Sequence, residues 1–174
     1  MRIIPGLSCL VFAVIATVAT SIPADSEIGV HGQLTQSGPQ AQADDLLVLA
    51  HSFQKYAEDF LGMANARKGD PEFEVLMYLH NGASSVTDHL SADYVIISMY
   101  DNVECGTDKV RIRPYISERF DYESKFIDFE VGTVNTALAH TAIPAAAQLG
   151  LQMKNDLRSA KQKLDKIVAL RVRV

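Results

Sequence analysis

Few residues of this chain have the types and spacings that catalysis requires. Five histidines and two cysteines are the candidate metal ligands and nucleophiles, and they form neither a Cys-x-x-Cys pair nor a Glu-x-x-His pair. Cys105 could act as a nucleophile only with a histidine brought close by the fold, and no local motif supports that pairing. A Gly-rich phosphate loop and a nucleophile elbow are also missing from the sequence. The sequence therefore favours a non-enzymatic protein, and it predicts no catalytic residue, no metal site and no cofactor.

The remaining polar candidates have ordinary structural explanations. His80 falls on the apolar face of a predicted helix, where a histidine is more often hydrogen bonded in a core than bound to a metal. Acidic residues of the next predicted helix alternate with Arg119 and Lys125, which is typical of a solvated face. These acidic residues are Glu118, Asp121, Glu123, Asp128 and Glu130. A second polar edge is predicted at Asp88, His89 and Asp93.

Cys105 is the only cysteine after the first 24 residues. In an exported protein a lone cysteine indicates either a free thiol or an intermolecular disulfide. Burial as a small apolar side chain is the commoner role of a single cysteine. All three alternatives stay open at the level of the sequence.

The first 24 residues have the pattern of a secretory signal peptide. Arg2 supplies a short positive region, residues 7–19 form an apolar stretch, and small residues at 19–24 offer a cleavage site. We therefore expect a secreted or periplasmic protein. The alternative is an uncleaved anchor, although a spanning helix needs about 20 apolar residues. A membrane is an expected partner only in that case.

Composition limits the number of domains and the classes of partner. The chain has 174 residues and a formal net charge of −5 at pH 7. Without the signal peptide about 150 residues remain, which is enough for one domain with its own core. The negative charge argues against nucleic acid as a partner.

Apolar residues recur at spacings of three and four from residue 44 onward, which predicts amphipathic helices. Residues 25–43 lack this period and predict a flexible arm or linker. The helices are expected over residues 44–67, 71–104, 114 or 117–141, and 145–170. A break near Gly82 is an open alternative, since glycine weakens a helix by about 1 kcal/mol. The predicted fold is an all-α antiparallel bundle of four or five helices over residues 44–174, preceded by the arm.

The second predicted helix is about ten residues longer than the first, and the third is longer than the fourth if it begins near Asp108, so their hairpin would extend beyond the four-helix body. Apolar and basic residues are concentrated at this hairpin end. Contiguous exposed apolar area usually marks a binding site, although the arm could instead fold over this end and bury it. The candidate binding residues are Ile97, Tyr100, Arg111, Arg113 and Tyr115.

The sequence as a whole predicts an exported helical module that binds a partner or has a structural role. Its expected partner is a protein or a small apolar ligand, and a homodimer is one possibility. The alternative is a bundle that holds a metal, a haem or a small apolar ligand in its core. Met63 and His140, which lie on different predicted helices, are an example of a residue pair that could hold a haem.

Overall fold

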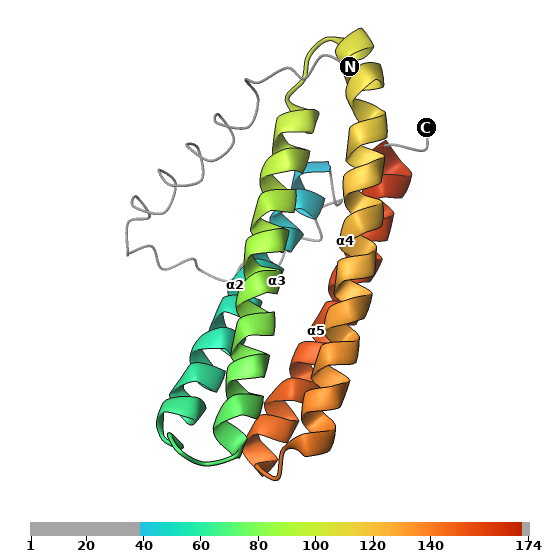
Figure 1. Ribbon diagram of the computed structural model, residues 1–174. Helices are drawn as coiled ribbons and strands as arrows, with labels where there is room; N and C mark the ends of the chain where they lie inside the picture. Colours follow the sequence, from blue (N-terminus) through green and yellow to red (C-terminus); the bar gives the residue numbers. More distant parts are fainter. Residues whose placement is uncertain (1–38, 172–174) are drawn as a thin grey trace, which may run out of the picture. The chain divides into compact units, whose positions relative to one another are not determined.

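The computed structural model describes residues 39–171, which form four α-helices and contain no strand. The helices are α2 (Pro39–Asn65), α3 (Glu72–Asp101), α4 (Gly106–His140) and α5 (Pro144–Arg171). Short connections make neighbouring helices antiparallel, so the prediction of an all-α antiparallel bundle is confirmed (Figure 1). Residues 1–38, which include the predicted signal peptide and most of the predicted arm, lie outside the described residues, as do residues 172–174.

The core is built from the apolar stripe of each helix. α2 lies beside α3 and α4 lies beside α5, and the two pairs pack face to face (Figure 1). Complete burial of a large apolar side chain stabilises a fold by about 1.5–3 kcal/mol. The largest fully buried side chains are Phe53, Phe60, Leu46, Leu76, Leu79, Leu90, Ile97, Ile127, Met153, Leu157, Leu164 and Ile167.

The turns at one end of the bundle are tied to each other by side chains. Gly69 has a φ of 90°, a backbone conformation that glycine adopts without strain, and it turns the chain between α2 and α3. The Asp70 carboxylate then accepts a hydrogen bond from the Glu72 amide (3.0 Å). Glu72 in turn accepts hydrogen bonds from the Thr141 hydroxyl (2.8 Å) and the Ala142 amide (2.6 Å). The start of α3 thus holds the connection between α4 and α5.

Two helices begin earlier than the sequence pattern predicts. α2 begins at Pro39, inside the segment predicted as an arm, and α4 begins at Gly106 and contains Pro114. Proline lacks the N–H that an interior helical position donates. The part of α4 that precedes Pro114 is held by contacts with the end of α3. Lys109 Nζ donates to the Asp101 carbonyl (3.1 Å), and Arg113 Nε donates to Tyr100 Oη (3.2 Å).

α3 continues through Gly82 without a break. Gly82 is buried, and a Cβ at this position would lie 2.8 Å from Glu130 Oε2. The glycine therefore provides space for a buried carboxylate of α4, which explains why a poor helix former occupies the middle of a long helix.

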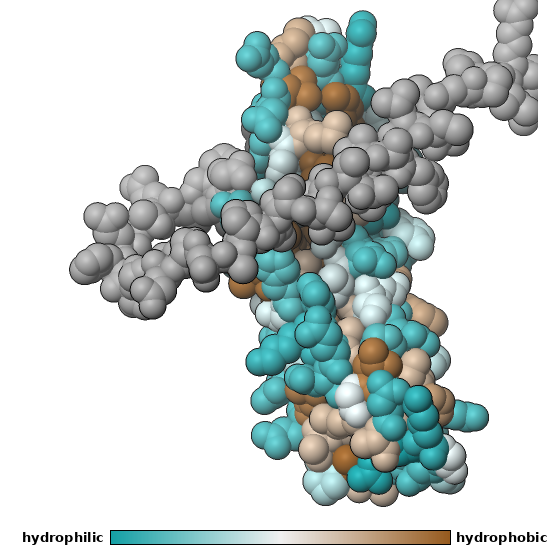
Figure 2. Space-filling view, turned by 90° about the vertical axis from the view of Figure 1, so that its left-hand side faces the viewer, coloured by the Kyte–Doolittle hydropathy of each residue, from teal (hydrophilic) through white to brown (hydrophobic). Residues whose placement is uncertain are grey.

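The surface of the bundle is mostly polar. In the view of Figure 2, apolar residues are mixed with polar ones at both the upper and the lower end of the bundle. At the upper end α3 and α4 extend beyond the other two helices (Figure 1). Within residues 39–171, none of the helices combines the length and the apolar character that crossing a bilayer requires.

Exchanging glycine for alanine at two helical positions tests the close approach at Gly82. Gly132→Ala in α4 should stabilise the protein by about 1 kcal/mol, because alanine favours a helix and nothing lies within 4 Å of the new Cβ. Gly82→Ala should stabilise it less or destabilise it, because the buried Glu130 carboxylate has to move. Urea unfolding measures both changes, and equal stabilisation by the two variants would contradict the packing described here.

Candidate functional site

Four ionisable side chains form a buried charge network between α3 and α4: His89, Asp93, Arg119 and Glu123. Arg119 connects the two acids, since its Nε donates to Asp93 Oδ1 (2.9 Å) and its Nη2 lies 3.0 Å from Glu123 Oε2. His89 Nδ1 lies 2.9 Å from the same Glu123 oxygen. The network thus joins α3 to α4 through charged hydrogen bonds.

Helical spacing brings these four side chains together. His89 and Asp93 are four residues apart on α3, and Arg119 and Glu123 are four residues apart on α4, so each pair shares one face of its helix. The carboxylates of Asp93 and Glu123 are fully buried, whereas the side chains of Arg119 and His89 are 28% and 25% exposed. The two carboxylates are thus shielded from water and depend on protein partners.

Burial changes the protonation of two acids at this interface. The pKa of Asp93 rises to about 7, first because burial disfavours its charged form and second because Glu123 is close; Arg119 opposes the rise. Burial also raises the pKa of Glu130. Oδ2 of Asp93 and Oε2 of Glu130 have no hydrogen-bond partner among the described residues. Each of these acids therefore keeps its proton to a higher pH than an ordinary carboxyl group does.

The prediction that these acids belong to a solvated face is wrong for Glu123 and Glu130, which are 0% and 5% exposed. Three other acids of the same stretch, Glu118, Asp121 and Asp128, are exposed as predicted. The missed signal is spacing, because Glu123 and Glu130 lie seven residues apart on the same stripe as Ile127.

Aromatic side chains form an exposed seam on α4, next to its buried stripe. Tyr115, Tyr122 and Phe129 are 72%, 56% and 65% exposed. Phe126 is half-buried and stacks on the His89 ring, with centroids 3.9 Å apart and planes at 15°. We define the seam as six residues of α4: the exposed Tyr115, Tyr122 and Phe129 and the half-buried Ile112, Arg119 and Phe126. Of these six residues, Tyr115 is the one that the sequence pattern predicted as a binding residue.

The structure separates the five residues predicted to form a binding surface at the hairpin end. Ile97 and Tyr100 are buried, at 0% and 5% exposure, so they do not contribute to a surface of the described bundle. Arg111 and Tyr115 are exposed, and Arg113 is half-buried with Nε donating to Tyr100 Oη. Only the part of this set that lies on α4 remains accessible.

Charged contacts close the hairpin end against the last helix. Tyr100 Oη donates to the carbonyl of Arg171 (3.1 Å). The buried Arg171 guanidinium pairs with Asp101 through Nε (2.8 Å) and Nη2 (2.7 Å), and its Nη1 donates to Gln42 Oε1 (3.1 Å). Arg171 thus connects the ends of α2, α3 and α5, which is a structural role.

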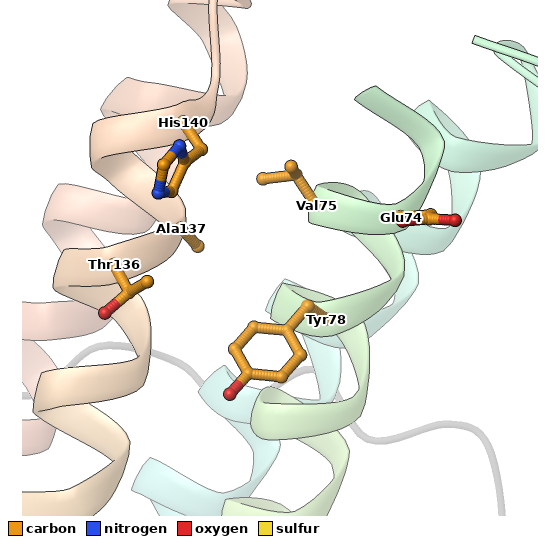
Figure 3. Close-up of a pocket in the computed structure, with 6 residues that line it drawn as sticks. All are labelled: Glu74, Val75, Tyr78, Thr136, Ala137 and His140. Carbon is orange, nitrogen blue, oxygen red and sulfur yellow. The ribbon is translucent and has the colours of Figure 1, made fainter. Parts of the chain in front are cut away.

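A small pocket lies between α3 and α4 at the end opposite the hairpin tip. Its volume is about 240 Å³, and Val75 and Tyr78 of α3 face Ala137 and His140 of α4 across it (Figure 3). The pocket opens at the side of the bundle and is not part of the core. His80 lies elsewhere on α3, and its Nδ1 is 2.8 Å from the Ala57 carbonyl.

Cys105 precedes the first residue of α4 and is exposed with a free thiol, so the interpretation of Cys105 as a buried apolar side chain is wrong. Hydrogen bonds from the backbone N–H groups of Asp108 and then Thr107 lower the pKa of this thiol. Among the described residues, no three His, Cys, Asp or Glu side chains are grouped so that they could hold a metal ion.

Replacing Asp93 with asparagine should reduce the pH dependence of stability. The pKa of Asp93 is about 7 in the folded protein, above the 3.8 of an ordinary aspartate. Between pH 3.8 and pH 7 the folded protein therefore keeps a proton on Asp93 that the unfolded chain has lost. This contribution to stability is complete below pH 4 and is lost as the pH rises through 7, by at most about 1.4 kcal/mol per pH unit. In Asp93→Asn, the free energy of unfolding should therefore fall less steeply from pH 5 to 7.5.

Asp88→Asn is the matched control, because Asp88 is an exposed acid five residues before Asp93 on α3. Its pH profile should run parallel to that of the wild-type protein. A smaller slope should remain in Asp93→Asn because the pKa of Glu130 is also raised. An unchanged slope in Asp93→Asn would show that this aspartate does not retain its proton on folding.

Cys105 should react faster with iodoacetamide in the folded protein than in the urea-unfolded chain at neutral pH. The reason is that the backbone N–H groups at the start of α4 stabilise the thiolate only when the helix is formed. Mass spectrometry of the peptide that contains Cys105 measures the alkylation rate against pH. A reaction midpoint at the same or a higher pH in the folded protein would contradict this expectation.

Comparisons with known proteins found no matching protein-family model, no matching curated protein and no matching solved structure. Two features stand out in the described bundle: the buried charge network and the exposed seam beside it.

Proposed function

We propose that this protein is an exported, non-enzymatic interaction module that binds a helical surface of a partner protein through the seam on α4. The observation that carries the proposal is the exposure of Tyr115, Tyr122 and Phe129, each more than half accessible on a bundle that already has a complete apolar core. Large aromatic side chains exposed in a row are costly in water and are typical of binding surfaces.

The spacing of the seam supports a helical partner. The three exposed aromatic residues lie seven residues apart, so they form a nearly straight row along α4. A row of this kind packs against a second helix, whose side chains fill the spaces between successive aromatic rings. Tyrosine and phenylalanine bury a large area with few rotatable bonds, which limits the entropy lost on binding.

A small-molecule ligand is less well supported than a protein partner. The pocket between α3 and α4 has a volume of about 240 Å³, whereas pockets for small ligands usually measure about 300–1,000 Å³. It also lies at the side of the bundle, while the alternative function requires a ligand in the core. The seam offers a longer apolar surface than this pocket does.

Export is part of the proposal because of the N-terminal sequence. The apolar stretch with one preceding arginine and small residues near position 24 supports secretion or delivery to a periplasm. The partner would then be a protein of the same extracytoplasmic compartment.

Photo-crosslinking tests whether the seam is a binding surface. The photoreactive residue p-benzoylphenylalanine is placed at position 122 in one variant and at position 162 in another. Gln162 is an exposed residue of α5 and serves as the control. In extracts of the organism that makes the protein, irradiation should give a defined adduct of higher mass only from position 122, because the seam contacts the partner closely.

Mass spectrometry then identifies the second component of the adduct. Adducts from both positions in equal yield would indicate non-specific contact and would contradict the proposal. An absence of adducts from position 122, with the variant folded as judged by circular dichroism, would also contradict it.

A further inference from the structure

The seam has the spacing of a coiled-coil face. Its members recur at alternating steps of three and four residues along α4. In heptad terms, position a is occupied by Ile112, Arg119 and Phe126, and position d by Tyr115, Tyr122 and Phe129. α3 contacts one flank of this face, where His89 stacks on Phe126. Along the other flank, no helix of the described bundle covers the exposed aromatic rings.

Three charged residues line that open flank: Arg111, Glu118 and Lys125. All three are exposed, and each immediately precedes an a residue, which is heptad position g. When two helices pack in antiparallel fashion, the g residues of one helix lie beside the g residues of the other. The order of the charges along this flank therefore determines which alignment of two such helices is favoured.

A second copy of α4 can pack on the seam in one alignment that pairs all six seam residues. In an antiparallel pair, each a residue faces a d residue of the other helix. The alignment with its two-fold axis between residues 120 and 121 sets Arg119 against Tyr122, Phe126 against Tyr115, and Ile112 against Phe129. Two-fold symmetry repeats each of these contacts, so the three pairings give six layers in total.

This alignment also pairs opposite charges. It places Glu118 of one copy beside Lys125 of the second copy, and symmetry repeats the pair on the other side. A shift of seven residues in one direction places Glu118 beside Glu118, and a shift in the other direction places Lys125 beside Lys125. A parallel pair would set Glu118 beside the acidic Glu123. Like charges at such positions are destabilising, so charge selects the antiparallel alignment centred between residues 120 and 121.

We propose that the partner of the seam is a second copy of this chain, bound antiparallel in this alignment. The inference rests on the proposed function, because it names the occupant of the same surface. The interface is self-complementary: each copy presents the same residues, and its acidic and basic positions exchange partners across the two-fold axis.

The dimer does not depend on a disulfide bond. Cys105 lies about 15 residues from the two-fold axis, so the two thiols are about 45 Å apart along α4 at 1.5 Å per residue. The association should therefore form equally well under reducing conditions. An intermolecular bridge at Cys105 would belong to a different contact.

Charge exchange tests the proposed alignment. Sedimentation equilibrium of the purified full chain under reducing conditions compares the wild-type protein with Glu118→Lys, Lys125→Glu and the double variant. Each single exchange creates two like-charge pairs and should weaken the dimer at least about tenfold. The double variant restores opposite charges in reversed order and should return to within about threefold of the wild-type dissociation constant.

Asp165→Lys, at an exposed position of α5, is the control for a change in net charge and should leave the dimer unchanged. Circular dichroism confirms that each variant keeps its helix content. A wild-type chain that stays monomeric at all concentrations would overturn the proposal, as would single exchanges without effect or a double variant as weak as the singles.

The photo-crosslinking experiment separates failure of this inference from failure of the proposed function. Adducts from position 122 with a different protein, formed by a monomeric chain, would overturn the dimer and leave the proposed function in place. Adducts between position 122 and residues 1–38 of the same chain would overturn both, because the N-terminal segment would then occupy the seam.

Discussion

The structure depends on the contact of buried charges between α3 and α4. Asp93 and Glu123 have no access to water, and Arg119 reaches both of them. Removing one partner of a buried charge network typically costs about 3–5 kcal/mol. A rotation of α4 about its axis, or a shift along it, would separate Arg119 from Asp93. The network therefore fixes both the rotation and the height of α4 relative to α3.

The rotation of α4 determines which of its residues face water. Successive residues of an α-helix point about 100° apart. Tyr122 and Phe129 each immediately precede a buried acid, Glu123 and Glu130, so the rotation that buries the acids turns the aromatic residues outward. The hydrophobic effect by itself would bury the aromatic side chains and leave the acids exposed. The exposure of the seam is thus a consequence of the charge network.

Glu130 extends the same constraint toward the other end of the bundle. Its carboxylate lies against Gly82, and any larger residue at that position would bring a carbon atom within 2.8 Å of Oε2. The buried acids therefore influence both helices: they require a particular rotation of α4 and a glycine within α3. The small α3–α4 pocket lies farther along the same interface, where Val75 of α3 and Ala137 of α4 line its opposite sides (Figure 3).

Sequence periodicity was sufficient to predict four helices, although not where α2 and α4 begin, because apolar residues at spacings of three and four identify a buried stripe without knowledge of its neighbours. It did not predict the burial of Glu123 and Glu130, since that burial depends on residues of α3: His89 contacts Glu123, and Gly82 leaves space for Glu130. The sequence of one helix is enough to predict which of its faces is apolar. Which residues of α3 and α4 contact each other depends on how the two helices are aligned. For the same reason Tyr100 was predicted to lie on the binding surface, whereas the structure buries it.

A thermodynamic double-mutant cycle on Asp93 and Arg119 would test most directly whether this contact governs the α3–α4 interface. The free energies of unfolding of the wild-type protein, Asp93→Asn, Arg119→Met and the double variant are measured at pH 8, above the pKa of about 7 at which Asp93 ionises. The account predicts a favourable coupling of more than about 1 kcal/mol between the two residues. Additivity of the two single changes to within about 0.5 kcal/mol would contradict it, because the charges would then not hold the helices together.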